Sequence, residues 1–588
     1  MSDPSNPGDD DAASELGWYV TKSEQQRAAT QDRRFDPRQD GWGSEYVASV
    51  ALDQLAKLST ALQSREIDDA TLDLICTPDF VTSPWRPDRF TTTQQLDSLV
   101  IHRCDDDIPA EFAAGPSGTA ALRREIEKLQ ACHQATIERA SFKLTRIDVA
   151  ELTAETEVRL YTFSHNSQLR TEQHTAWNCQ WEHDGTHLRI ASIQRTEYVE
   201  TVEQTSDTAW FADCTQAVLA SNSCLDTQLA HGLDHWTRHI PRSHGIDVYT
   251  RVGLAVADVD GNGLEDVYVC QPGGLPNRLF LQQADGTAIE RAAEAGIDWL
   301  DATTSALFVD LDNDGDQDLA VTLPTAVLCL ANDGQGRFAL QSTLPLSDRD
   351  AHSLSAADYD QDGRLDLYVC VEFASESATG PQFVYHDAND GGRNVLFRNE
   401  IEPSSTPWLF RDVTQEVGLD IDNRRHSLAA AWEDYDDDGD PDLYVANDYG
   451  RNCLYQNNNG RFANVAAAQR VEDYGSGMSV SWSDVNRDGH VDLYVGNMFS
   501  SAGSRITHQD AFQSSLDGET QSIYQRFVKG NTLFVQRPDH SFSDQGRMAG
   551  VERARWAWSS LLADINNDGW DDALVTNGYI TGEDTDDL

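Results

Sequence analysis

The chain has 588 residues, and its 98 Asp and Glu against 44 Lys and Arg give a formal net charge of −54 at pH 7. This charge argues against free nucleic acid and anionic membrane surfaces as partners. No stretch reaches the ~20 apolar residues needed to cross a bilayer, and residues 1–18 lack the basic and apolar regions of a secretory signal. At roughly 100–200 residues per domain, the length predicts two to four domains.

The first 204 residues divide into two parts. Residues 1–40 are polar and aperiodic, which predicts a flexible leader. Residues 41–204 predict a small α+β domain. Within it, apolar residues recur at helical spacing over 45–62 and 119–136, and alternating runs that predict an antiparallel four-strand meander follow at 140–150, 155–165, 171–183 and 186–199.

This order of elements, together with the ending WNCQWEHDGTHLRIASIQ, resembles the cone-shaped fold of the nuclear transport factor two and SnoaL-like families. The resemblance implies a curved sheet that can enclose a pocket. Tyr161, Trp177 and Trp181 then either line that pocket or form the core between helices and sheet. We favour the core.

From residue 205 onward, six copies of the pattern D-x-[DN]-x-[DN]-G-x-x-D organise the sequence. We name them acidic loops one to six: 258–266, 310–318, 358–366, 434–442, 484–492 and 564–572. Calcium takes six to eight oxygen ligands, and short acidic or amide side chains at alternate positions of a tight loop, with a glycine at the turn, supply them.

We therefore predict about six Ca²⁺ ions, each held by the side chains at positions 1, 3, 5 and 9 and the carbonyl at position 7. The predicted ligands are Asp258, Asp260, Asn262, Leu264 and Asp266; Asp310, Asp312, Asp314, Asp316 and Asp318; Asp358, Asp360, Asp362, Arg364 and Asp366; Asp434, Asp436, Asp438, Asp440 and Asp442; Asp484, Asn486, Asp488, His490 and Asp492; and Asp564, Asn566, Asp568, Trp570 and Asp572.

The residues around each loop predict a β-hairpin rather than an EF-hand. An EF-hand needs an acidic ligand at position 12, where this chain has Val269, Val321, Val369, Val445, Val495 and Val575. Short apolar runs precede and follow each loop, and two further strand-like runs follow most of them. Four antiparallel strands per unit predict a mainly β protein, a β-propeller with six countable blades and possibly seven.

The loops and the phrases GGLPNRLF, DLYVANDYG, NMFSSAGSRI and WAWSSLLADINNDGWDD carry a family resemblance. They are similar to the FG-GAP or VCBS repeats of integrin α-subunit propellers and to bacterial proteins related to cartilage acidic protein, although the ASPIC/UnbV segment of that family is not recognisable. The resemblance implies a calcium-binding propeller over 205–588.

The sixth unit has little chain left for its outer strands. Residues 210–219 share the pattern F-x-D-x-T-Q-x-V with 408–419, which lie in the third unit's outer strand. We therefore predict that residues 209–216 supply the outer strand of the sixth unit and close the ring.

The leading functional prediction is a non-catalytic propeller, stabilised by calcium, that mediates adhesion or recognises an extracellular protein or polysaccharide. Sites of this type fill where calcium is near millimolar, which favours an extracellular, cell-surface or periplasmic location. Two long connections, 371–393 and 498–530, carry aromatic residues with His386, His508, Arg505 and Arg526. They are either ligand-contact loops or plain solvent-exposed insertions, and any ligand site is expected on them rather than on the repeats.

Two enzymatic alternatives stay open at this point. One is a carbohydrate-active enzyme on the propeller, similar to a polysaccharide lyase, which a His, Tyr and Arg cluster beside a calcium ion would favour. The other is a small-molecule enzyme or binder in the N-terminal cone, which a deep pocket with a carboxylate and a histidine would favour. No nucleophile elbow, phosphate loop or dinucleotide fingerprint is present.

Three smaller patterns also have interpretations. His231, His235 and His239 share one face if their segment is helical, which suits either a transition metal or a solvated surface, and we favour the latter. Trp432 and Trp482 precede acidic loops and are expected in the blade core. Among the ten cysteines, Cys214 and Cys224 are close enough in sequence to pair, while Cys270, Cys329 and Cys370 fit buried strand positions.

Overall fold

The computed structural model describes residues 43–96, 98–104, 112, 115–184, 187–204, 211–241, 252–374, 386–403, 405–512 and 516–577. The predicted leader, 1–40, lies outside them. The chain divides into two compact units, residues 1–208 and 209–588.

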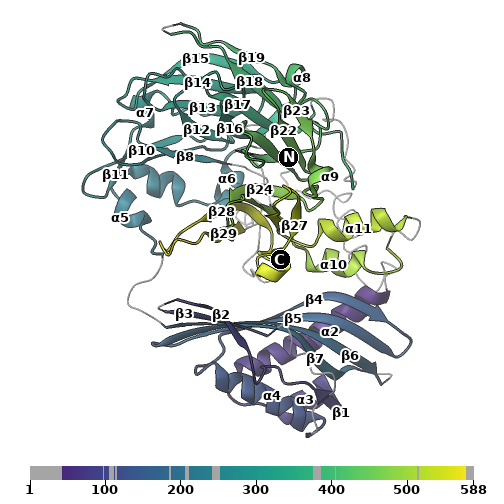
Figure 1. Cartoon of the computed structure of the whole chain (residues 1–588). Helices are drawn as coiled ribbons and strands as arrows, with labels where there is room; N and C mark the ends of the chain where they lie inside the picture. The colour runs from purple at the N-terminus through teal and green to yellow at the C-terminus, as the bar shows by residue number, and fades with distance from the viewer. Residues whose placement is uncertain are drawn as a thin grey trace, which may run out of the picture. The chain divides into compact units, whose positions relative to one another are not determined.

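The first unit is a sheet covered on one face by helices (Figure 1). The helices are α2 (Gly43–Gln63), α3 (Asp69–Ile75) and α4 (Thr119–Cys132). The strands are β1 (Cys76–Thr82), β2 (Thr91–Gln95), β3 (Leu99–Arg103), β4 (Arg139–Val149), β5 (Thr153–His165), β6 (Leu169–His183) and β7 (Leu188–Gln204). The sheet order β2-β3-β7-β6-β5-β4, with β1 parallel to β7, contains the predicted four-strand meander β4 to β7. Sequence reasoning missed α3 and β1 to β3.

Buried and more exposed side chains alternate along β5 and β6, so that the buried side chains form the sheet face that packs against the helices. Trp177 and Trp181 lie fully buried on that face, and Trp177 packs against Trp85 with ring centroids 4.7 Å apart. The preference for a core role is therefore confirmed for both tryptophans. The core prediction is wrong for Tyr161, which belongs to the opposite face, where its ring lies 5.1 Å from that of His174.

A buried polar network lies between α4 and the sheet. The His133 ring is hydrogen-bonded to Ser164 Oγ (2.7 Å), Thr162 Oγ1 (3.0 Å) and Gln173 Oε1 (3.2 Å). Gln173 Nε2 in turn donates to Glu200 Oε2 (2.7 Å). Burial lowers the pKa of His133 from its ordinary 6.5 to about 4, because the charged ring loses its hydration.

Stability of the first unit will depend on pH through His133. Between pH 6.5 and 4 the unfolded chain takes up a proton that the folded ring does not, so acidification over this range removes about 3 kcal/mol of stability. Native-state hydrogen exchange of the β4–β7 amides measures the loss. In His133→Gln we expect the free energy of unfolding to fall less steeply between pH 7 and 4 than in wild type. An equally steep fall in both proteins would contradict the role given to His133.

The second unit is built from repeated antiparallel sheets. Five sheets have four strands each: β8 (Leu254–Ala257), β9 (Asp266–Val269), β10 (Arg278–Gln282), β11 (Ala288–Glu290); β12 (Ala306–Val309), β13 (Asp318–Leu323), β14 (Ala326–Asn332), β15 (Phe338–Pro345); β16 (Arg349–Ala357), β17 (Asp366–Phe373), β18 (Val395–Asn399), β19 (Phe410–Asp412); β20 (Ser427–Glu433), β21 (Asp442–Asn447), β22 (Cys453–Asn457), β23 (Phe462–Asn464); and β24 (Gly477–Ser483), β25 (Asp492–Asn497), β26 (Thr532–Gln536), β27 (Phe542–Asp544). The sixth pairs only β28 (Ala557–Ala563) with β29 (Asp572–Asn577).

Short helices complete the unit: α5 (Thr215–Leu219), η1 (Leu225–Leu229), α6 (Leu233–His239), α7 (Ala292–Ala295), α8 (Thr414–Val417), α9 (Ala466–Gln469), α10 (Ser501–Thr507), α11 (Gly518–Phe527) and α12 (Gly546–Ala549). The first strand of each sheet packs on the first strand of the next, from β8 through β12, β16, β20 and β24 to β28. Apolar cores fill the spaces between consecutive sheets. The mainly β, propeller-like fold with six countable blades is thus confirmed.

The ring-closure prediction is wrong for the residues that can be described. Residues 211–214 form no strand and α5 begins at Thr215, while residues 209 and 210 lie outside the described part. Asn222 Nδ2 donates to the Ala288 carbonyl and Asn222 Oδ1 accepts from Glu290 N, both at 2.8 Å. Through Asn222, this segment therefore hydrogen-bonds the backbone of the edge strand β11 in the first sheet, instead of adding a strand to the sixth sheet.

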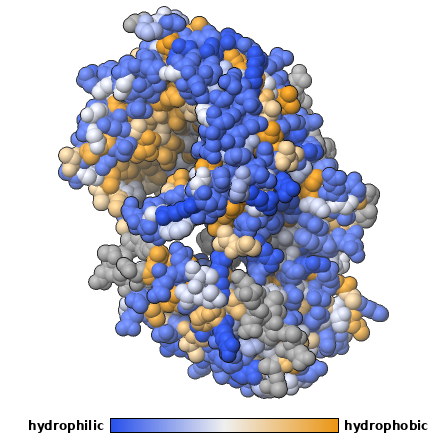
Figure 2. All heavy atoms as spheres, in the orientation of Figure 1, coloured by the Kyte–Doolittle hydropathy of each residue, from blue (hydrophilic) through white to orange (hydrophobic). Residues whose placement is uncertain are grey.

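Apolar side chains stay exposed on the first and last sheets, at Leu254, Val256, Leu561 and Leu574. The visible surface of the second unit is otherwise largely hydrophilic, with an apolar hollow (Figure 2). Among the residues described, no strand joins the sixth sheet to the first.

All ten cysteines are unpaired, so Cys214 and Cys224 form no disulfide. Cys214 is exposed and precedes α5, whereas Cys224 is buried against β10 and β11. Cys270, Cys329 and Cys370 are buried, as predicted.

Candidate functional site

Each acidic loop joins the first strand of its sheet to the second, and its own side chains hold it in shape. In loop four, Asp434 at position 1 accepts hydrogen bonds from Asp438 N (3.1 Å) and Gly439 N (2.9 Å). The residue at position 4, Asp437, has φ +59° and Gly439 has φ +91°, so two left-handed residues make the tight turn. Asp442 at position 9 accepts from Tyr435 N (3.2 Å) and Asn457 N (2.6 Å).

The carboxylates at positions 1, 3 and 9 converge in loops one to four. One oxygen from each of the three lies within 4.8 Å of the others. At position 3, Oδ1 of Asp312, Asp360 and Asp436 is shielded from solvent and has no hydrogen-bond partner among the described residues. An orphaned, buried carboxylate oxygen beside two other carboxylates fits a metal ion. In loops five and six, position 3 is Asn486 and Asn566, so an amide oxygen replaces the carboxylate.

Burial raises the pKa of the carboxyls at position 9. The pKa of Asp318 rises to about 7, that of Asp366 to about 7 and that of Asp442 to about 8, because desolvation and neighbouring carboxylates disfavour the charged form. A bound cation would reverse this by stabilising the ionised form. A proton and a bound cation would therefore compete for these carboxyls.

In loop three, a positive side chain already lies against the carboxylates. Arg398 Nε donates to Asp360 Oδ2 (2.7 Å) and Arg398 Nη2 donates to Asp362 Oδ2 (2.9 Å). Arg364 also contacts Asp362. A divalent ion in this loop would share Asp360 and Asp362 with Arg398.

Buried amides link each of sheets two to five to the acidic loop that precedes it. Sequence reasoning missed these links. Asn332, Asn399, Asn457 and Gln536 end the third strands of sheets two to five. Each backbone N–H donates to the position-9 carboxylate of its own sheet, at 2.6–2.9 Å. Each side-chain amide donates to the carbonyl at position 2 of the preceding loop, at 2.6–2.8 Å. The signal was present as an Asn or Gln at the end of each third strand, but its partner lies about 73–101 residues away.

The side chain at position 4 also reaches toward the next loop. Asn313 Nδ2 donates to the Gly363 carbonyl (2.9 Å), and Gln361 Nε2 donates to the Gly439 carbonyl (2.6 Å). Arg487 lies over the ring of Trp570, 4.2 Å from its centroid. The loops are thus linked in succession as well as through their strands.

The predicted ligand-contact loops lie at the opposite strand ends, because they join the second strand of a sheet to the third. Residues 375–385 of the first connection and 513–515 of the second lie outside the described part. The second connection folds into α10 and α11. His386 from one connection and Tyr524 from the other come together, with ring centroids 5.7 Å apart, and Phe512 lies 5.4 Å from Tyr524.

More half-exposed rings and charges belong to the same ends of the strands. Tyr449 stacks on Phe527 at 5.9 Å. Arg526 Nη2 donates to the buried Asp473 at 2.8 Å, and Arg451 Nη2 donates to Asp387 at 3.0 Å. We name His386, Tyr449, Phe512, Tyr524 and Phe527 the aromatic cluster. His508 bonds back to its own helix through the Ser504 carbonyl, 2.8 Å from Nδ1.

Trp432 and Trp482 are half-buried in the blade cores, as predicted, against Tyr368 and Tyr444 respectively. The three histidines of 231–239 stack in succession, with centroids 4.0 and 4.3 Å apart. In the described residues their ring nitrogens do not form a group that converges within 4.8 Å.

The first unit has a cavity of about 440 Å³ on the sheet face away from its helices. Its lining includes Phe163, His165 and Arg170, together with Leu99, Glu138, Glu172, Thr201 and Glu203. His165 Nδ1 lies 2.6 Å from Glu138 Oε1. Within the described residues, no helix is both long and apolar enough to span a membrane.

Comparison with known proteins agrees with the repeats. A family model described as FG-GAP-like repeat matches residues 258–321, 310–369 and 434–495. No curated protein matches the chain.

The solved structures similar to this chain include the following three proteins. An Agrocybe aegerita lectin specific for non-reducing terminal N-acetylglucosamine is 15% identical over 57% of this chain and 76% of the lectin, with TM-score 0.33. The Vibrio cholerae biofilm matrix protein Bap1 is 14% identical over 51% of this chain and 39% of its own, with TM-score 0.27. A protein named Rd1NTF2_04 with long sheet is 8% identical over 25% of this chain and 98% of its own, with TM-score 0.16.

Because these TM-scores are below 0.5, the fold assignment rests on the sheet topology and the repeat match. The chain contains FG-GAP-like repeats over residues 258–369 and 434–495, and these repeats lie in the sheets of the propeller-like unit.

Proposed function

We propose that the second unit is a calcium-stabilised propeller that recognises a polysaccharide or a protein outside the cytoplasm, without catalysing a reaction. The support for calcium is the donor set, since every side chain at positions 1, 3, 5 and 9 offers oxygen and none offers sulfur or imidazole. Six divalent ions, at two charges each, would change the net charge from −54 to −42. Calcium binding to the folded state alone stabilises it.

The aromatic cluster is the single observation that carries the recognition role. Exposure of apolar ring surface to water is unfavourable, and half-exposed rings provide flat apolar faces for a sugar ring or a peptide side chain. Arg451 and Asp387 add polar contacts at the same strand ends. The His, Tyr and Arg residues of this region lie at the strand ends away from the acidic loops, so a mechanism that joins them to a loop-bound calcium has no support from the described residues.

A binding experiment with the full chain tests this role. Calcium-loaded protein is titrated with a panel of soluble polysaccharides while product release is followed. We expect binding without turnover, and Tyr524→Ala to weaken it at least about tenfold, as loss of one aromatic contact of ~1.4 kcal/mol does. Tyr46→Ala, an exposed tyrosine in the first unit, is the matched control.

Two results would contradict the proposal. Product that disappears with chelator while the fold survives would make the protein an enzyme. Equal binding by Tyr524→Ala and wild type would remove the aromatic cluster from recognition.

The first unit has a second candidate function, a small-molecule binding site in its 440 Å³ cavity. The volume lies within the ~300–1,000 Å³ range of ligand pockets, and the lining pairs an aromatic ring with His165, Arg170 and three carboxylates. This mixture favours a small ligand that carries charge. Binding that is lost in Arg170→Ala, and kept in Tyr524→Ala, would assign a ligand to this cavity.

A further inference from the structure

The junction between acidic loops four and five differs chemically from the other junctions. At the two preceding ones, a neutral amide at position 4 donates to a backbone carbonyl of the next loop. At this junction, position 4 is the carboxylate of Asp437 and position 7 of the next loop is His490. Asp437 Oδ2 lies 4.0 Å from His490 Nδ1, beyond hydrogen-bond distance.

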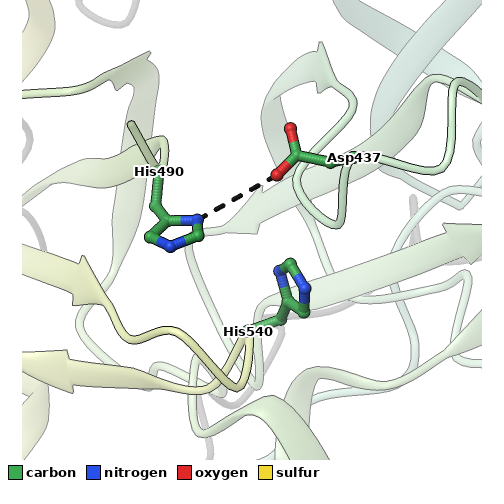
Figure 3. A group of neighbouring side chains, drawn as sticks. All are labelled: Asp437, His490 and His540. Carbon is green, nitrogen blue, oxygen red and sulfur yellow. Dashed lines mark ion pairs between the residues drawn. The ribbon is translucent and has the colours of Figure 1, made fainter. Parts of the chain in front are cut away.

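A second imidazole completes the group. His540 lies in the turn between β26 and β27, where its φ of +60° fixes the direction of its side chain. The His490 and His540 ring centroids are 5.9 Å apart and the rings are perpendicular. Figure 3 shows the three side chains, from three separate turns, projecting toward a shared space.

In the described part of the chain, one ring nitrogen of each histidine lacks a hydrogen-bond partner. Nδ1 of His490 and Nδ1 of His540 are both shielded from solvent, and neither has a hydrogen-bond partner in the part of the chain that is described. A ring nitrogen of each histidine and one oxygen of Asp437 lie within 4.8 Å of one another. Two orphaned imidazole nitrogens beside a carboxylate are the donor set that borderline divalent metals prefer.

We propose that Asp437, His490 and His540 bind a divalent transition metal of the zinc class, at a site distinct from the acidic loops. Zinc bound at about 2.0–2.2 Å needs ligand atoms roughly 3.3–3.5 Å apart, so the group must contract by less than ~1.5 Å. Asp437 is 70% exposed and able to supply that movement. Three protein ligands leave a fourth position for water or an external donor.

This site would join the fourth and fifth sheets at their loop ends. Asp437 belongs to the fourth sheet's loop, whereas His490 and His540 belong to turns of the fifth. Calcium does not compete well for imidazole nitrogen, and zinc has little preference for the all-oxygen loops. The two metals are therefore expected to bind together.

The test uses the full chain in millimolar calcium, so that the acidic loops are supplied with their own ion. Zn²⁺ is titrated against a chromophoric chelator, and Co²⁺ is added separately to record its visible spectrum. We expect one Zn²⁺ per chain, and loss of one ligand in His490→Gln, His540→Gln or Asp437→Asn to weaken binding about 100-fold. His235→Gln, which alters the stacked histidines of 231–239, is the matched control and keeps wild-type affinity.

The outcomes separate this site from its alternatives. Absence of Zn²⁺ binding to wild type, or equal affinity in wild type and His540→Gln, would overturn the proposal and leave an ordinary ion pair. Zinc binding lost in His235→Gln would place the metal in the 231–239 segment. An unchanged calcium count in His490→Gln and His540→Gln shows that the variants are folded.

Discussion

We expect removal of calcium to lower the unfolding temperature of the second unit by more than about 10 °C at pH 8. An ion at 100 times its Kd adds ~2.7 kcal/mol to the folded state, so six ions add up to ~16 kcal/mol, and in a unit of this size 1 kcal/mol corresponds to roughly 2 °C. Without the ion, the half-buried carboxylates at positions 1 and 3 and the buried carboxylate at position 9 repel one another. Calorimetry of the full chain with calcium or with chelator measures the difference.

The effect of pH provides an internal control. The pKa of Asp318, Asp366 and Asp442 is raised to about 7–8 in the folded, ion-free loops, so these groups take up protons on folding. These ionised groups destabilise the folded, ion-free protein fully at pH 8. The destabilisation decreases as the pH falls toward their ordinary pKa of about 3.8. The difference in unfolding temperature between protein with calcium and protein with chelator should therefore be smaller at pH 5 than at pH 8. A difference below 2 °C at pH 8, or one that grows on acidification, would contradict the account.

Replacement of Asp442 by alanine has the second large effect. This side chain is a predicted metal ligand and also accepts from Tyr435 N and Asn457 N in the protein interior. Asp442→Ala leaves two buried N–H groups unpaired and removes a ligand, which together cost about 3–5 kcal/mol. We expect the unfolding temperature in calcium to fall by roughly 5–10 °C.

Two variants separate the roles of Asp442. Asp442→Asn keeps an acceptor for Tyr435 or Asn457 and loses the charge, so it should fold in calcium with one fewer bound ion. Asp298→Asn removes an exposed charge from the same unit and should match wild type. If Asp442→Ala and Asp298→Asn have the same unfolding temperature in calcium, the side chain at position 9 is neither a metal ligand nor a stabilising hydrogen-bond acceptor.

The repeated hairpins were predictable because their signal is local. Position 12 valines, alternating apolar runs and the loop glycines fall within about ten residues of each acidic loop, and the first and second strands of all six sheets occupy the expected places. The four long strands β4 to β7 were predictable for the same reason. The weakly amphipathic β1 to β3 were missed, and β2 is exposed along its whole length.

Long-range partners were not predictable from patterns. The likeness of residues 210–219 to 408–419 led to the wrong sheet, because Asn222 bonds to the edge of β11 instead. The links from Asn457 to the Tyr359 carbonyl and from Asp437 toward His490 join residues of different repeats. A single sequence gives the residue types at such positions but not which of them meet.

The most direct test is the number of calcium ions that the full chain retains. Protein freed of metal is equilibrated with micromolar to millimolar calcium, and bound ion is counted by equilibrium dialysis with elemental analysis. The account predicts about six ions per chain for wild type and one fewer for Asp442→Asn. A wild-type count of zero or one, or the same count in Asp442→Asn, would contradict the proposal that the acidic loops hold calcium.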